Sequence, residues 1–450
     1  MPLPPGPTAH PVVQMARWFR NPLPLMDEAH RRFGDAFSLR LAGMPAPLVV
    51  VSHPEVIKEV FALGPDQAHA GKANLVLKPF LGVHSLLLLD GAEHLRQRKM
   101  MLPAFHGERM HAYGRSMIEL AHHSIDRWPI GQKFAVHGPM QEVTLQVIIR
   151  TVFGIAEGPR FAELADLLTR TLRVATRPGL LFAFMQRDLG PMSPWGRFKR
   201  LAARTSGLLR DEIRSARDKG TAGRNDVLAM MLDARDEAGS PLSEDEIHDE
   251  LMTLLIAGHE TTATSLAWAL RWILPDAPLV QRLRQEIAGA GEDPQAIGKL
   301  ELLDATVKES LRLQPIIPLV ARILQEPFEF GGLRLPTGTL VTPSVYLVSR
   351  RPSLYPDPER FVPSRFLTFK PAPWEWLPFG GGLRRCIGAA FAMFEMKMVL
   401  ASVLGRVDAR LASDNVRVTR RAITLAPSGG LPVIVTSRRP REAVASRTAA

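Results

Sequence analysis

Cysteine is the scarcest residue of this chain, with only Cys386 among 450 residues. A single thiol cannot form an internal disulfide, so the chain is not a disulfide-stapled secreted scaffold, and a reducing compartment suits it. Long apolar runs are missing too: no stretch approaches the roughly 18 consecutive apolar residues of a membrane-spanning helix. Residues 1–7 lack the apolar core of a signal peptide. We therefore expect a soluble, cytoplasmic protein without a membrane anchor.

Acidic residues are outnumbered: 45 Asp and Glu stand against 56 Lys and Arg, a net charge of +11. A basic balance favours an acidic partner, which could be nucleic acid, an anionic membrane or an acidic protein. The Lys and Arg residues are dispersed and no nucleic-acid-binding module is recognisable, so we expect no nucleic-acid partner. The composition, 46% hydrophobic and 22% charged, excludes a disordered, collagen-like or coiled-coil chain.

Flexible linkers, internal repeats and low-complexity tracts are also lacking, which predicts one domain over residues 1–450. We expect a Pro-rich, extended lead-in over about residues 1–15 and a flexible basic tail over about 438–450. Helical periodicity dominates residues 90–315, and short strand-like runs occur before and after it. The sequence predicts a mainly α fold with a smaller β part.

The segment around the cysteine, Phe379-Gly-Gly-Gly-Leu-Arg-Arg-Cys386-Ile-Gly388, is the most informative stretch. Consecutive glycines let the backbone turn tightly and approach another group closely. Arg384 and Arg385 favour the thiolate, and the apolar helix predicted after Gly388 favours a negative group at its N-terminus. A lone cysteine is more often an inert buried hydrophobe. Here the surroundings favour a thiolate with a chemical role.

This segment resembles the haem-binding loop of the cytochrome P450 family, whose pattern is F-x-x-G-x-R-x-C-x-G. The fixed positions are filled by Phe379, Gly382, Arg384, Cys386 and Gly388. The resemblance implies that the Cys386 thiolate is the axial ligand of the iron of haem b. It also implies the cytochrome P450 fold, a helix-rich domain around the haem with a β-sheet region on its N-terminal side.

A second motif, Ala257-Gly258-His-Glu260-Thr261, lies in a long apolar helical pattern. A mid-helix glycine costs about 1 kcal/mol relative to alanine. A distorted turn beside a ligand would explain it, and so would a tolerated glycine with solvent-facing polar neighbours. The run resembles the oxygen-binding helix of the family, A-G-x-[DE]-T. By that resemblance Ala257 and Gly258 lie at the haem, Thr261 hydrogen-bonds dioxygen and Glu260 relays protons.

Four polar residues are candidates to bind the haem propionates. His94 and Arg98 are spaced i, i+4 and can share one face of a helix, although a surface charge cluster would look the same. They resemble the W-x-x-x-R pattern of the family, with His in place of Trp. Arg322 matches a family arginine on a strand, and with Arg384 it would complete a cationic clamp.

Glu309-Ser-Leu-Arg312 and Phe361-Val-Pro-Ser364-Arg365-Phe366 precede the cysteine. A surface ion pair is the usual explanation of an E-x-x-R spacing. The two segments resemble E-x-x-R and F-x-P-E-R-F of the family, with Ser364 in place of Glu. The resemblance implies a buried triad of Glu309, Arg312 and Arg365 that holds the haem loop.

The implied activity is that of a haem-thiolate monooxygenase, which inserts one oxygen atom of O2 into a C–H bond. We find no G-x-G-x-x-G after a predicted strand and thus no Rossmann segment for a flavin or nicotinamide. Electrons, ultimately from NAD(P)H, are therefore expected from a ferredoxin or flavodoxin with its reductase. A peroxygenase or rearranging haem-thiolate enzyme and a non-enzymatic haem protein are the alternatives, and Glu260 with Thr261 argues against both.

The basic charge suggests where an acidic redox partner docks. Arg96, Lys99, Arg385 and Lys397 lie near the haem motifs and are candidates for that surface. Steering by such charges weakens as salt rises. Ordinary solvated charges are the alternative.

The substrate is expected to be an apolar small molecule such as a fatty acid, a terpene or a polyketide-like compound. By resemblance the pocket walls are near residues 66–90, 175–190, 316–320 and 425–431. Part of their apolar residues could instead belong to the core. The candidates are Leu75, Leu77, Phe80, Leu86, Leu87, Leu181, Phe182, Phe184, Ile316, Ile317 and Leu319.

Overall fold

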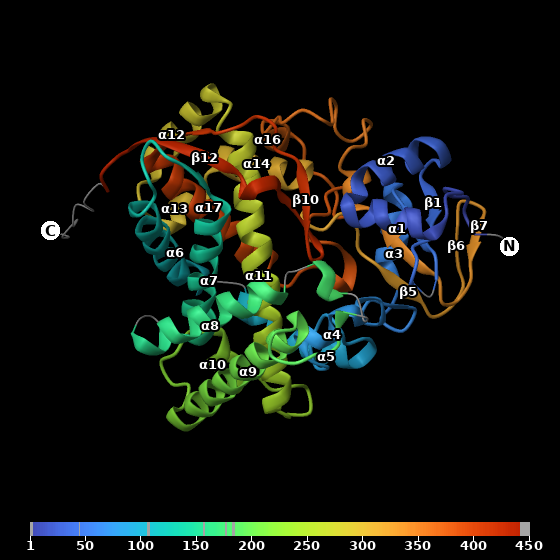
Figure 1. The fold of residues 1–450 in the computed structure, drawn as a ribbon, viewed down its shortest axis with the longest axis horizontal. Helices are drawn as coiled ribbons and strands as arrows, with labels where there is room; N and C mark the ends of the chain where they lie inside the picture. Colours follow the sequence, from blue (N-terminus) through green and yellow to red (C-terminus); the bar gives the residue numbers. More distant parts are fainter. Residues whose placement is uncertain are drawn as a thin grey trace.

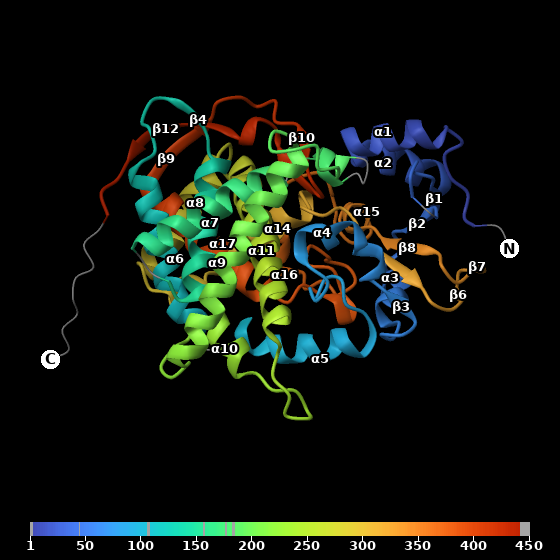
Figure 2. The same ribbon diagram turned by 60° about the horizontal axis from the view of Figure 1, so that its bottom comes forward.

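The structure is a computed structural model, and it describes residues 3–44, 46–105, 109–155, 158–175, 178–181 and 185–441 (Figure 1). Helices make up most of this part of the chain and strands a smaller share, so the predicted fold class is confirmed. The strand-rich part and the N-terminus lie at one end of the molecule, and most of the helices lie at the other (Figures 1 and 2).

The elements follow one another along the described chain as follows. The α-helices are α1 Pro11–Arg20, α2 Pro22–Phe33, α3 Pro54–Ala62, α4 Lys78–Leu81, α5 Gly91–Met101, α6 Arg109–Asp126, α7 His137–Phe153, α8 Pro159–Ala175, α9 Pro194–Lys219, α10 Val227–Asp233, α11 Glu244–Ile273, α12 Ala277–Ala290, α13 Pro294–Gly298, α14 Glu301–Leu313, α15 Val345–Val348, α16 Arg365–Thr368 and α17 Ala389–Arg406. The strands are β1 Ala36–Leu39, β2 Leu48–Val51, β3 Ala68–His69, β4 Lys133–Ala135, β5 Arg322–Leu324, β6 Phe328–Phe330, β7 Leu333–Leu335, β8 Leu340–Pro343, β9 Val407–Leu411, β10 Val418–Arg421, β11 Thr424–Pro427 and β12 Pro432–Arg438. The 3-10 turns are η1 Lys72–Leu77, η2 Leu102–Phe105, η3 Pro178–Leu181, η5 Gly382–Arg384 and η6 Ser428–Gly430.

The largest sheet has the strand order β1-β2-β8-β5-β3. Strands β2 and β8 pair in parallel, although almost 290 residues separate them, and the other neighbours pair antiparallel. Leu48, Val49, Val50 and Val51 of β2 are all buried, as expected for a strand that is covered on both faces. The sheet therefore joins a segment near the N-terminus to one that follows most of the helices in the sequence.

Helix α11 runs through the middle of the helical part (Figures 1 and 2). It opens with a capping box, in which Ser243 and Glu246 satisfy each other's backbone N–H groups. The helix continues without interruption to Ile273, so of the two alternatives for Gly258 the tolerated glycine agrees with the structure. A Cβ on Gly258 would lie 2.9 Å from Cδ1 of Ile148 on α7. Close packing of α7 against α11 therefore explains this glycine.

Both chain ends depart from the prediction where the structure describes them. Helix α1 begins at Pro11, so residues 11–15 are helical and not extended. Arg438 donates to the carbonyl oxygens of Ile125 and Asp126 at 2.8 and 2.6 Å. Arg441 pairs with Glu292 at 2.9 Å. The basic tail is thus anchored up to Arg441, and its remaining residues, 442–450, lie outside the described part.

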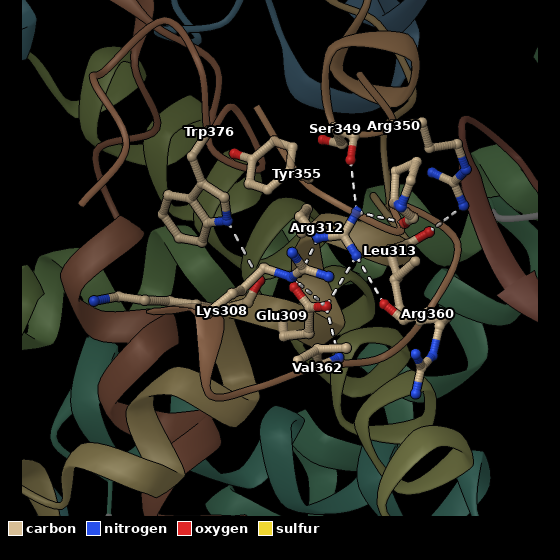
Figure 3. Close-up of polar contacts among 12 residues, drawn as sticks. Lys308, Glu309, Arg312, Leu313, Ser349, Arg350, Tyr355, Arg360, Val362 and Trp376 are labelled. Atoms are coloured by element: carbon tan, nitrogen blue, oxygen red, sulfur yellow. Dashed lines mark hydrogen bonds and ion pairs between the residues drawn. The ribbon is translucent and has the colours of Figure 1, made fainter. Parts of the chain in front are cut away.

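The carboxylate of Glu309 is the centre of a buried ion-pair cluster (Figure 3). Arg312, one turn further along α14, donates to its two oxygens at 2.7 and 2.9 Å. Arg365 and the backbone N–H of Val362 donate to Oε1 at 3.0 and 2.8 Å. Arg312 also donates to carbonyl oxygens of the segment between β8 and α16, namely those of Ser349, Pro358 and Arg360.

The predicted triad of Glu309, Arg312 and Arg365 is therefore present. The side chains of Glu309 and Arg312 have no exposed surface, and the guanidinium of Arg312 also stacks over the ring of Tyr355, 5.0 Å from its centroid. Because both guanidinium groups bind the one carboxylate and Arg312 also binds three backbone carbonyls, the cluster fixes the irregular chain that leads toward the cysteine loop.

Replacement of Glu309 by Ala tests this cluster. It leaves two buried guanidinium groups without a carboxylate, and breaking a buried pair in this way costs about 3–5 kcal/mol. We expect a large loss of soluble yield and a lower denaturation midpoint. Glu329→Ala breaks an exposed pair with Arg334 and should change stability by less than about 1 kcal/mol. Equal stability of the two variants would contradict a supporting role for the cluster.

A second set of contacts pins the segment Gly82–Asp90 to α11. The N–H of His84 donates to Asp249 at 2.9 Å, and the N–H of Leu86 donates to Glu250 at 2.5 Å. Gln97 of α5 donates to the same oxygen of Glu250 at 2.5 Å. Two consecutive carboxylates of α11 thus hold a segment that lies about 165 residues earlier in the chain.

Burial raises the pKa of Glu250 to about 8, and the negative charges of Asp249 and Glu246 act in the same direction. The hydrogen bonds from Leu86 and Gln97 oppose this shift but do not cancel it. The other oxygen of Glu250 is buried without a hydrogen-bond partner among the described residues. Glu250 is therefore a group that gains its charge only above neutral pH.

Glu250→Gln should remove a pH dependence of stability. The folded state holds the Glu250 proton up to about pH 8, whereas the unfolded chain releases it near the ordinary value of 4.5. Between these values the folded state binds more protons, so the wild type loses stability relative to the variant as pH rises. The measurement is the melting temperature of both proteins from about pH 5 to about pH 8. Parallel curves would show that the carboxyl is not shifted.

Candidate functional site

The cysteine loop lies between η5 and α17. The N–H of Cys386 donates to the carbonyl oxygen of Phe379 at 2.9 Å and closes the loop. Gly382 has a φ of +63°, and a Cβ at this position would lie 2.3 Å from the backbone oxygen of Phe61. Only glycine fits here. The glycine therefore lets the loop pack directly on the end of α3.

Burial raises the pKa of the Cys386 thiol, whereas the N–H of Gly388 and the charges of Arg98 and Arg385 lower it. The net shift is upward: Arg385 favours the thiolate, as predicted, but burial outweighs its effect. The thiol is surrounded by protein and yet keeps accessible surface, which means that it faces an internal space. A metal ion bound there would deprotonate it.

His94, Arg98, Arg322 and Arg384 are brought together as the sequence predicted. His94, Arg322 and Arg384 line one recess together with Phe61. Burial lowers the pKa of His94 to about 3, and the positive charges of Arg384, Arg98 and Arg322 lower it further in the same direction. The imidazole is therefore neutral and can still donate one hydrogen bond.

This group of cations has little negative charge beside it. Arg384 pairs with Asp90 and also donates to backbone carbonyls of the segment Gly82–Asp90. Arg322 donates to the carbonyl oxygen of Ala321 at 2.8 Å. The guanidinium of Arg98 makes no hydrogen bond or ion pair within the described ranges. Burial lowers the pKa of both Arg322 and Arg384 to about 10.

The residues present fit a haem. A thiol that faces an internal space can supply the axial ligand. Three guanidinium groups with one carboxylate among them leave room for two further negative charges, as a pair of propionates provides. The neutral imidazole of His94 can donate to the same groups.

Thr261 and Ala257 of α11 keep accessible surface, whereas Glu260 and Thr262 are buried. The hydroxyl of Thr261 donates to the carbonyl oxygen of Ala257 at 2.5 Å. This contact spans one helical turn and leaves the oxygen of the hydroxyl able to accept a further hydrogen bond.

Glu260 lies in a separate, buried polar network. Its Oε2 accepts from Gln141 at 2.5 Å, and its Oε1 lies 2.9 Å from the guanidinium of Arg421 on β10. His137 of α7 is 3.8 Å from Oε1 and 3.0 Å from the hydroxyl of Thr264. Burial raises the pKa of Glu260, and Arg421 and Gln141 lower it. The carboxylate thus faces α7 and β10.

Sequence reasoning did not find Arg421, Gln141 or His137. Arg421 stands about 160 residues after its partner, on a strand that pairs only with β11. No motif or spacing indicates such a contact, because the approach of the hairpin to α11 is decided by packing of the whole helical part.

The four lysine and arginine residues suggested for docking differ in their accessibility. Lys397 is buried and donates to the carbonyl oxygen of Gly298 at 2.6 Å, with Asp304 at 3.2 Å. A docking role for Lys397 is therefore ruled out. It joins α17 to α13 and α14 instead.

Two of the other three are already paired. Arg96 binds Asp236 and Glu246 at 2.6 and 2.8 Å. Lys99 forms an exposed pair with a glutamate at 2.5 Å. Arg385 is exposed and its guanidinium has no partner in the part of the chain that the structure covers. Of the four, only Arg385 offers a charge that is not already compensated.

The predicted pocket walls are part core and part surface. Phe80 is buried with Phe198, their ring centroids 5.0 Å apart, and Leu86 is buried too. Leu75 and Leu87 are exposed. The side chains of Leu181, Phe182 and Phe184 lie outside the described residues.

Comparison with known proteins supports a single family. The family model "Cytochrome P450" matches residues 4–429. Cytochrome P450 135B1 of Mycobacterium tuberculosis is 40% identical, over 100% of this chain and 94% of that protein. Cytochrome P450 135A1 of the same species is 37% identical, over 95% of this chain and 94% of that protein. A solved structure of cyanobacterial CYP120A1 with bound retinoic acid has a TM-score of 0.84 and 26% identity, and covers 97% of this chain and 100% of that chain.

Within the described residues, no helix combines the length and apolar character needed to cross a membrane. The relatives named above are bacterial, and their family uses haem and dioxygen with electrons from a redox partner. The fold, the matched length and the identity to these relatives agree with the motifs around Cys386 and Thr261, and this chain belongs to the cytochrome P450 family.

Proposed function

We propose that this protein hydroxylates an apolar small molecule with one oxygen atom of O2, with Cys386 as the thiolate ligand of haem b. One observation carries the proposal: the only thiol of the chain faces an internal space at the end of a closed loop, with Arg98 near it and His94, Arg322 and Arg384 gathered around one recess. Haem bound there would supply the binding and reductive activation of O2.

The cationic residues would hold the haem through its propionates. Arg98 and Arg322 are not paired with a carboxylate, and they would gain one on binding. Arg384 would share its charge with Asp90, to which it is already bound. His94 would donate its one N–H as a neutral imidazole.

Thr261 and Glu260 would deliver protons to O2. The Thr261 hydroxyl donates its one hydrogen to the carbonyl of Ala257 and can accept another; to donate toward O2 it would leave that carbonyl. Glu260 must exchange protons with water, yet Arg421 and Gln141 hold it in the structure. Release of the carboxylate from Arg421 is therefore a step that we assign to the working enzyme.

The substrate class that we propose is an apolar molecule of fatty-acid, terpene or polyketide-like type. The retinoic acid bound to CYP120A1, an apolar isoprenoid with a carboxylate, supports this class for a chain of the same fold. We propose a ferredoxin or flavodoxin with its NAD(P)H-dependent reductase as the electron source. A location in the cytoplasm stays a prediction.

The carbon monoxide difference spectrum of the reduced, haem-loaded protein tests the ligand. We expect the strongly red-shifted Soret band of thiolate ligation, because the sulfur donates more electron density than imidazole. Cys386→Ser should bind haem without this band. A wild-type band at the position typical of imidazole ligation would contradict the assignment.

Thr261→Ala tests the proton delivery. Without the hydroxyl, electrons should still be consumed but less product should form for each pair. General acid–base groups contribute about 10²–10⁴-fold, so we expect at least a tenfold lower yield per electron. Thr262→Ala removes a buried hydroxyl next to it and should leave the yield near that of the wild type. An unchanged yield in Thr261→Ala would favour chemistry that does not need dioxygen.

A further inference from the structure

Arg420 of β10 is a largely buried cation that lies between two aromatic rings. Its guanidinium is 5.5 Å from the ring centroid of Trp18 and 5.4 Å from that of Phe19, both on α1. Its Nε is buried without a hydrogen-bond partner. Burial lowers the pKa of Arg420 to about 10, and no neighbouring charge contributes to the shift.

Several other buried guanidinium groups in the protein are paired with a carboxylate. Arg312 has Glu309, Arg384 has Asp90 and Arg406 has Asp126 at 2.7 Å. Within the described residues, neither a carboxylate nor a carbonyl oxygen forms a hydrogen bond with the guanidinium of Arg420. Cation–π contacts stabilise part of the charge, but they leave the buried Nε–H of Arg420 without an acceptor.

The position of Arg420 connects it to the site. It precedes Arg421, which reaches Glu260 next to Thr261. Since successive side chains of a strand point to opposite faces, Arg420 points to the α1 side while Arg421 points to α11. The β10–β11 hairpin therefore contacts α11 through Arg421 and α1 through Arg420.

The same surface is basic and apolar at once. Arg17 and Arg20 lie in the last turn of α1, where Arg17 is paired with Glu28 at 2.6 Å. Val12 and Val13 of the same helix are exposed. A ligand that fits both properties has an apolar body and a negative end.

We propose that Arg420, with Trp18 and Phe19, binds the carboxylate of an amphiphilic substrate. This inference rests on the proposed function and narrows its substrate class to long-chain or isoprenoid carboxylic acids. The fork of the guanidinium matches a carboxylate in two parallel hydrogen bonds, and the rings cover the apolar carbons next to it. The negative charge supplies the compensation that Arg420 lacks in the protein alone.

The test compares dodecanoic acid with its methyl ester, which has the same chain without the charge. Binding to the haem-loaded protein is measured by calorimetry and by the change of the Soret band. We expect the acid to bind at least tenfold more tightly than the ester, because the carboxylate accepts charge-assisted hydrogen bonds that the ester cannot form. Arg420→Gln should remove this preference and leave the affinity for the ester unchanged.

Two further variants complete the experiment. Arg417→Gln removes an exposed arginine of the same region and should keep the preference for the acid. Arg420→Lys keeps the charge, and should keep part of the preference even if Arg420→Gln does not fold. With the wild type alone, the affinity for the acid should fall between low and high salt, and the affinity for the ester should not.

Equal binding of acid and ester to the wild type would overturn the inference. An Arg420→Gln variant that loses affinity for both ligands equally would also overturn it, because Arg420 would then serve only to hold α1 in place. Neither result touches the proposed function, whose failure would show in the carbon monoxide spectrum instead. A red-shifted band together with equal binding of the two ligands would therefore remove this inference alone.

Discussion

Pairing of buried positive charge is the constraint on which the rest of the structure depends. Arginine and lysine outnumber the acidic residues, and several of them lie inside the protein. A buried guanidinium is tolerated only when carboxylates or carbonyl oxygens take the place of water. Glu309 provides the carboxylate for Arg312 and Arg365. Arg312 also donates to backbone carbonyls of the irregular segment between β8 and α16, and these hydrogen bonds hold that segment in place.

The same constraint joins the two walls of the site. Asp90 neutralises Arg384, and the segment that ends at Asp90 is held at its other end by Asp249 and Glu250 of α11. The segment between α4 and α5 is therefore fixed to the cysteine loop on one side and to the helix that carries Thr261 on the other. Movement of α11 relative to the cysteine loop would strain these hydrogen bonds.

Where the pairing is incomplete, the structure indicates a ligand. Arg98 and Arg322 lack carboxylates and lie where haem propionates would bind. The buried Nε–H of Arg420 has no acceptor among the described residues, and Arg420 lies on the opposite face of the hairpin that holds Glu260 through Arg421. The two cases differ in one respect: a family pattern pointed to the first group, whereas no motif points to Arg420.

The sequence by itself determined the fold class, the loop around Cys386, the triad of Glu309, Arg312 and Arg365, and the convergence of His94, Arg98, Arg322 and Arg384. These depend on short spacings that local geometry and a family pattern make recognisable. Tertiary structure decided what depends on contacts far apart in the sequence. Tertiary packing buries Lys397, brings Glu260 against Arg421, and places Ile148 of α7 next to Gly258. It also raised the pKa of the Cys386 thiol, because burial outweighs the adjacent positive charges, and burial is a property of the packed protein that neighbouring residues in the sequence do not define.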